Sequence, residues 1–316
     1  MKKVSRANTY FLIIVLLQLF LPVHLIFNWL QITDIRLILV INHIIIFIFP
    51  AIIYLIITKQ SARKVLKLNK LYFKDSLLIV LLAFVCQPIM AFFSLLSQFF
   101  FENEIGNFMT EIVNTPYIFL LLLVAVLPAI TEEVTIRGVV LSGYEDKNIY
   151  LSCIVTGLLF GIMHLDPQQF LYATVLGGVL ALVVRITNSI FAASLIHFLI
   201  NGTSITLQKL LSLIPQSTSV MEQATEVSLK AMPIGGKLFI MVFYGGLALA
   251  FSICAYFIIK KLAELNIRRG VISKEEMSIK ASKSNERVFN IQFIIIIIIY
   301  LLYMMSGVII RYLFSI

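Results

Sequence analysis

Nine long apolar stretches constrain this chain more than any other feature of its sequence. They run over residues 9–30, 36–58, 76–100, 116–142, 148–165, 168–186, 189–212, 237–261 and 290–314. A helix needs about 20 apolar residues to cross the hydrocarbon core of a bilayer, and most of these stretches reach that length. The fifth and sixth are shorter and are separated by Asp166-Pro167, so they also fit one re-entrant pair. The sequence therefore predicts an all-α, polytopic membrane bundle of about eight or nine transmembrane helices.

The composition excludes a soluble domain of this size. The chain is 60% hydrophobic and only 13% charged, with a mean hydropathy of +1.00 over 316 residues. No soluble fold could bury that much apolar surface. The first stretch follows a basic start and has no small-residue cleavage site after it, so we expect a retained anchor rather than a removable signal peptide.

The net charge of +9 is concentrated in a few segments. Cations cluster in residues 2–6, 59–74 and 260–287, and the alternate loops, such as 101–111, are poor in cations or acidic. By the positive-inside rule this pattern predicts a multi-pass plasma-membrane protein with a cytoplasmic N-terminus. We expect residues 61–73 to form a basic amphipathic helix on anionic headgroups, which makes membrane lipids the partner of this charge and not nucleic acid.

Three ionisable residues near the end of the fourth stretch have no place in a purely structural span. In AITEEVTIRG, Glu132 and Glu133 follow Pro128 by about one turn, and Arg137 follows one turn after Glu133. Charged groups at such depth are costly and usually face the bundle interior. Glu133 and Arg137 are four residues apart in the favourable order, so we expect them to pair. Glu132 then needs a partner from another helix.

Two histidines stand on helix faces that carry other polar or small residues. His164 follows Gly157 and Gly161 on one face, and small residues at that spacing let helices approach closely. His197 and Asn201 belong to a polar stripe that also contains Ser194, Ser204 and Gln208. Counted at about 1.5 Å per residue from the cytoplasmic span ends, Glu132, His197 and Asn201 lie roughly 13–20 Å deep and His164 about 24 Å deep. His24 and His43 have no acidic or amide neighbour one turn away, and we expect interfacial or packing roles for them.

One carboxylate, two imidazoles and an amide are suited to amide-bond hydrolysis. A carboxylate and a neutral imidazole can hold and deprotonate a water, and a second imidazole with an amide N–H can stabilise the oxyanion. Alternatively, Glu132, His164 and His197 could ligate a divalent metal such as zinc that activates the water. There is no HExxH motif, and spacing alone does not separate the two possibilities.

The same residues carry a resemblance to a known family. Glu132-Glu133-x-x-x-Arg137, Phe160-x-x-x-His164 and His197-x-x-x-Asn201 resemble the three-motif signature of the CPBP family, named for CAAX proteases and bacteriocin-processing enzymes and also called the Abi family. These are multi-helix intramembrane endopeptidases. The resemblance implies a catalytic core at 115–212, between N-terminal helices at 1–114 and C-terminal helices with a basic linker at 213–316.

The resemblance also implies roles for individual residues. Glu132 and His164 would activate the hydrolytic water, and His197 and Asn201 would line the oxyanion site. Glu133 and Arg137 would support the site, and Phe160 would pack against it. The resemblance allows a metal-free glutamate mechanism, which we favour over a metal-dependent one.

The substrate is the least constrained part of the prediction. Relatives are associated with the trimming of prenylated proteins, with bacteriocin maturation and with self-immunity. We expect the substrate here to be a membrane-associated peptide or small protein, lipid-associated ones included. Two further readings stay open: a catalytically silent family member that acts as an immunity or scaffold protein, and a proton-coupled transporter that uses Glu132 and the histidines as a relay.

Overall fold

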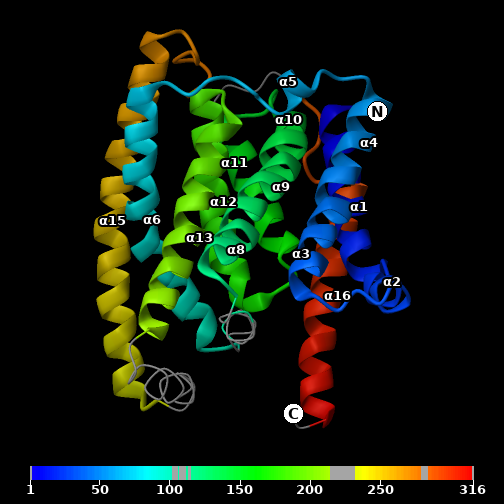
Figure 1. Cartoon of the computed structure of the whole chain (residues 1–316). Helices are drawn as coiled ribbons and strands as arrows, with labels where there is room; N and C mark the ends of the chain where they lie inside the picture. The colour runs from blue at the N-terminus through cyan, green and yellow to red at the C-terminus, as the bar shows by residue number, and fades with distance from the viewer. Residues whose placement is uncertain are drawn as a thin grey trace.

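The structure, a computed structural model, describes residues 2–101, 106, 112, 115–213, 232–278 and 284–314, and the side chains of all of these but His24 and 307–314. Within these ranges the chain is helical and contains no strand, which confirms the all-α prediction (Figure 1). In the described part of the chain, seven helices are long and apolar enough to cross a membrane. Two further apolar helices, Ile149–Met163 and Ile291–Ser306, are shorter. The nine predicted stretches thus each contain a helix.

The helices have the following bounds. They are α1 (Lys3–Phe20), α2 (Val23–Trp29), α3 (Ile35–His43), η1 (Ile44–Ile48), α4 (Phe49–Thr58), α5 (Ala62–Val65), α6 (Phe73–Gln98), α8 (Tyr117–Leu120), η2 (Leu121–Val126), α9 (Leu127–Glu133), η3 (Val134–Val140), α10 (Leu141–Gly143), α11 (Ile149–Met163), α12 (Pro167–Thr187), α13 (Ile190–Ser212), α15 (Ile234–Arg268) and α16 (Ile291–Phe314). The labels η1, η2 and η3 denote π-helical turns inside longer helices.

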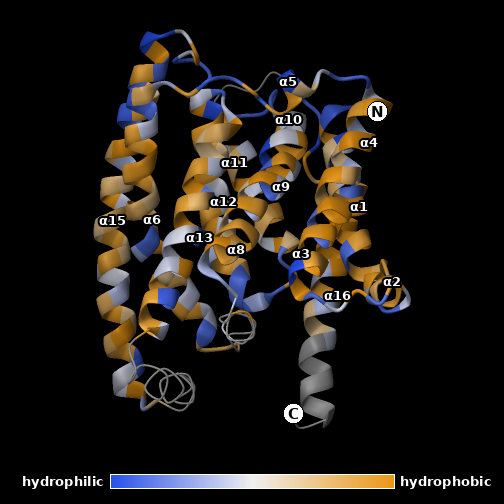
Figure 2. Cartoon of the chain, in the orientation of Figure 1, coloured by the Kyte–Doolittle hydropathy of each residue, from blue (hydrophilic) through white to orange (hydrophobic). Residues whose placement is uncertain are grey.

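The helices form one bundle with two flanks. α11, α12, α13 and the helix from α8 to α10 lie in the middle, α6 and α15 pack together on one flank, and α1 packs with α16 on the other (Figure 1). The N-terminus, α5 and the loop after α15 lie at the same end of the bundle. Hydrophobic residues line most of each helix, whereas α9 carries hydrophilic residues in mid-bundle (Figure 2).

The bounds of the first predicted span are wrong. The apolar stretch 9–30 is divided in the structure between α1, which begins at Lys3 and ends at Phe20, and the short helix α2. Pro22 lies between them and takes a non-helical conformation. Proline lacks the N–H that a continuing helix requires, so it ends α1 although the hydropathy continues past it.

The prediction of an amphipathic helix at 61–73 is also wrong. Within this segment only Ala62–Val65 and Phe73, the first residue of α6, are helical. The segment that follows is bound to the α12–α13 turn, because the Ile190 N–H donates to the Lys67 carbonyl at 3.1 Å and the Asn69 amide donates to the Asn188 carbonyl at 2.8 Å. The Lys67 carbonyl, which would accept a bond within a continuing helix, is thus bonded to α13 instead, and both contacts hold the basic segment against the end of the bundle.

The approach of α11 to α12 depends on glycine. A Cβ at Gly157 would lie 2.6 Å from the Thr174 carbonyl oxygen and 2.7 Å from the Gly178 nitrogen, and one at Gly161 would lie 2.8 Å from the Phe170 carbonyl oxygen. Backbone atoms cannot move aside as side chains do, so only glycine allows this spacing. The close helix contact predicted for Gly157 and Gly161 is confirmed, and α11 also packs against η3, which brings Phe160 beside Arg137.

Candidate active site

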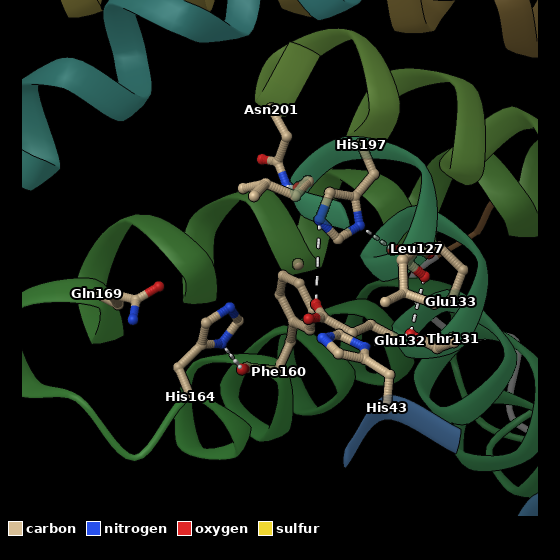
Figure 3. Close-up of polar contacts among 12 residues, drawn as sticks. His43, Leu127, Thr131, Glu132, Glu133, Phe160, His164, Gln169, His197 and Asn201 are labelled. Atoms are coloured by element: carbon tan, nitrogen blue, oxygen red, sulfur yellow. Dashed lines mark hydrogen bonds and ion pairs between the residues drawn. The ribbon is translucent and has the colours of Figure 1, made fainter. Parts of the chain in front are cut away.

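A cavity of about 830 Å³ opens among α6, α9, α11, α12, α13 and α15. Most of the predicted site residues line it: Glu132, Phe160, His164, His197 and Asn201. Their side chains converge from three helices (Figure 3). From the polar stripe of α13, Ser204 and Gln208 also line the cavity. The structure therefore brings together residues that lie up to about 70 positions apart in the sequence.

Glu133 and Arg137 lie beneath this cavity and form the pair predicted from their spacing. Arg137 Nη1 donates to Glu133 Oε1 at 2.8 Å, and both side chains are fully buried. Arg137 Nη2 also donates to the Gly177 carbonyl at 3.2 Å, and its guanidinium lies 4.2 Å from the centre of the Phe160 ring. The ring contacts His164 and His197 edge-on. Arg137 and Phe160 thus support both imidazoles from below.

Hydrogen bonds to Nδ1 determine how the imidazoles present themselves to the cavity. His197 Nδ1 lies 2.8 Å from Glu133 Oε1, and His164 Nδ1 lies 2.8 Å from the Phe160 carbonyl oxygen. A carboxylate and a carbonyl only accept, so Nδ1 carries the proton in both rings. In the neutral ring Nε2 is then an acceptor with a free lone pair. Both histidines are therefore arranged as proton acceptors.

Glu132 faces His197 across a short gap. Of the described histidine side chains, only His197 brings a nitrogen within 4.0 Å of this carboxylate, with Nε2 4.0 Å from Glu132 Oε2. Glu132 Oε2 is buried and has no hydrogen-bond partner among the described residues. Two acceptors cannot bond to each other, so the gap suits a group that donates to both. A water with hydrogen bonds of about 2.8 Å to each atom fits between them.

Asn201 replaces a backbone hydrogen bond that is missing in the facing helix. Pro128 has no N–H to give to the Val124 carbonyl four residues earlier, and Asn201 Nδ2 donates to that carbonyl at 3.0 Å. π-helical turns on both sides of α9 further displace the usual bonding pattern, which is common at functional sites. One amide N–H of Asn201 is thereby used, and the second stays available at the cavity wall.

His43 is the site residue that sequence reasoning missed. We expected a packing or interfacial role, but His43 lines the cavity beside Glu132 (Figure 3). Its Nδ1 lies 2.7 Å from Thr131 Oγ1, whose own proton goes to the Leu127 carbonyl at 2.9 Å. His43 Nδ1 therefore donates, and its Nε2 is a third acceptor. The available signal was the cost of an imidazole about a third of the way along the span Ile35–Thr58.

The donor set for a metal ion does not come together in this structure. Among the described residues, no three His, Cys, Asp or Glu side chains are close enough to hold one ion. The Nδ1 bonds of His164 and His197 are of the kind that metal ligands make. However, the Phe160 ring lies between His164 and the other two side chains of the set (Figure 3). The set Glu132, His164 and His197 does not fit a metal, and we derive no step from one.

Comparison with known proteins agrees with this geometry. Residues 114–203 match the family model described as type II CAAX prenyl endopeptidase Rce1-like. Because of this similarity, residues 114–203 are referred to as the Rce1-like domain. The matched residues contain α9, α11, α12 and the first half of α13, and with them the seven predicted site residues but not His43. The Rce1-like domain supports a membrane-embedded endopeptidase. No curated protein and no solved structure matches the chain.

Proposed function

We propose that this protein is an intramembrane endopeptidase that hydrolyses a peptide bond with a water held between Glu132 and His197. The observation that carries the proposal is the 4.0 Å separation of Glu132 Oε2 and His197 Nε2, two acceptors that face each other at the wall of a large cavity. The family match of this segment to endopeptidases gives independent support.

The reaction follows from the acceptor roles of these groups. Glu132 takes one proton from the water while the water oxygen bonds to the substrate carbonyl carbon. The free amide N–H of Asn201 stabilises the oxyanion that forms. Glu132 then gives its proton to the leaving nitrogen as the C–N bond breaks. The second proton of the water passes to His197 Nε2 as the carboxylate product forms. Glu133 stabilises the resulting imidazolium, since its carboxylate accepts from Nδ1.

The cavity wall suggests an uncharged substrate segment. Its polar lining away from Glu132 and the histidines consists of amides and hydroxyls: Gln87, Ser94, Gln168, Gln169, Tyr172, Asn201, Ser204, Gln208 and Tyr244. Amide and hydroxyl groups can bond to a peptide main chain, whereas a charged side chain would find no opposite partner there except Glu132. We propose that the substrate is a membrane-associated peptide or small protein, lipid-associated ones included, that is cleaved within an uncharged stretch. Bacteriocin or signal-peptide maturation would supply such substrates.

The location is part of the same proposal. The basic segments 2–6 and 59–74 lie at one end of the bundle, where they suit the anionic cytoplasmic surface of the plasma membrane. The cavity would then extend from Glu132 toward the opposite side of the membrane, because its lining includes Gln168 at the start of α12 and Gln208 near the end of α13.

The proposal is tested with purified protein in detergent and a quenched-peptide library, uncharged or with Asp or Lys beside the scissile bond. The wild type should cleave uncharged peptides, and Glu132→Gln should lose about 10²-fold or more in kcat, as expected for the loss of a general base. Cleavage by Glu132→Gln at the wild-type rate would overturn the mechanism. No cleavage by the wild type would favour a silent immunity or scaffold protein, and uptake that depends on Glu132 in vesicles would favour a transporter. Activity that persists in chelator, without bound metal, is the expected result for a metal-free reaction.

A further inference from the structure

A second pocket adjoins the site and belongs largely to the N-terminal helices. It has a volume of about 270 Å³ and shares Glu132, His43 and His164 with the large cavity. Its remaining lining residues are Gln18, Leu39, Asn42, Ile46, Phe47 and Met163. They come from α1, α3, η1 and the end of α11, so most of them lie outside the Rce1-like domain. Glu132, His43 and His164 therefore lie between two pockets that are lined by different helices.

The second pocket is surrounded by unsatisfied acceptors. Gln18 Oε1, Asn42 Oδ1 and Glu132 Oε2 are buried oxygens with no hydrogen-bond partner among the described residues. The orientation of Gln18 is determined by its Nε2, which donates to the Met163 carbonyl at 2.9 Å. A buried acceptor without a partner costs about 1–3 kcal/mol, so three of them around one pocket favour a ligand that donates.

We infer that this pocket binds water and supplies the hydrolytic water to Glu132. Water is the small neutral molecule that donates two hydrogen bonds, and it takes up only about 30 Å³ in the liquid, so the pocket holds several. The second half of the inference rests on the proposed function. Each hydrolysis consumes one water, and a peptide in the large cavity covers Glu132 from that side. Glu132 and His43 also line the second pocket, so water there can still reach Glu132 when a peptide fills the large cavity.

Two methionines allow the first half to be tested without any substrate. Met163 lines only the second pocket and Met90 only the large cavity. Radiolysis of bound water oxidises nearby methionines to the sulfoxide, which mass spectrometry measures. We expect oxidation of Met163 in the wild type and a several-fold decrease in the double variant Gln18→Leu/Asn42→Leu, with Met90 unchanged. No oxidation of Met163 in the wild type, or equal oxidation in the variant, would overturn the inference even if the protein is a peptidase.

Kinetics test the second half with an uncharged quenched peptide that the wild type cleaves. The double variant should lose about tenfold in kcat, the equivalent of one hydrogen bond, with KM unchanged. Asn42→Ser alone keeps an oxygen at the pocket wall and should retain most of the wild-type kcat. Gln87→Leu, which alters only the large cavity, should instead raise KM. A wild-type kcat in the double variant, or a change in KM alone, would contradict the supply of water from this pocket. A thermal unfolding curve separates either effect from a loss of folded protein.

Discussion

Replacing Arg137 by alanine should destabilise the whole bundle. The Arg137 side chain is fully buried and contacts the Glu133 carboxylate, the Gly177 carbonyl and the Phe160 ring. Its removal leaves Glu133 as a buried charge whose one remaining partner among the described residues is His197. Breaking a buried pair in this way costs about 3–5 kcal/mol. At about 2.1 cal/mol/K of unfolding entropy per residue, that corresponds for 316 residues to a decrease of roughly 5–8 °C in Tm.

The measurement is thermal unfolding followed by far-UV circular dichroism in detergent. A double variant, Glu133→Gln with Arg137→Met, removes both charges and should recover much of the lost stability, because no buried charge is left alone. The exposed pair of Asp34 and Arg36 provides a matched control, and Arg36→Ala should leave Tm unchanged within error since water screens the pair. An Arg137→Ala protein that unfolds at the wild-type temperature would refute the argument.

Three further outcomes follow from the geometry. Asn201→Leu should abolish most of the activity and lower the free energy of unfolding by about 1–3 kcal/mol, because the Val124 carbonyl loses its donor; unchanged stability would contradict that contact. Gly157→Ala should lower Tm, because the added Cβ clashes with backbone atoms of α12 at a cost of about 1–3 kcal/mol. Gly246→Ala, where a Cβ meets no atom within 4 Å, should leave Tm unchanged. Equal effects of the two variants would refute the packing argument. His43→Phe should reduce kcat about tenfold or more in the peptide assay, since it removes an acceptor beside Glu132, and a wild-type kcat would exclude His43 from the site.

Local patterns predicted much of this structure because the forces behind them act over one or two turns. The apolar stretches became helices, the four-residue spacing of Glu133 and Arg137 produced a buried pair, and Gly157 and Gly161 produced a close helix contact. Each of these depends on hydropathy, helical periodicity or side-chain size, which are readable from the sequence.

The errors arose where distant contacts or one special residue decided the outcome. Pro22 ended α1 inside an apolar stretch because a missing N–H outweighs hydropathy. Hydrogen bonds to Asn188 and Ile190, about 120 residues away, kept most of residues 61–73 from forming a helix. His43 could not be assigned because its partner, Thr131, lies 88 residues along the chain. Periodicity within one helix carries no information about such pairings.

The contacts of α1 and α3 with the helix that carries Glu132 bear on how small a working unit can be made. Tyr10 bonds to Thr135 and His43 bonds to Thr131. Segments far upstream of residue 114 therefore hold the helix on both sides of Glu132. A fragment trimmed to the matched residues would retain every signature side chain and still lose these braces. A fragment made to carry this site should therefore include the N-terminal helices α1 and α3 as well.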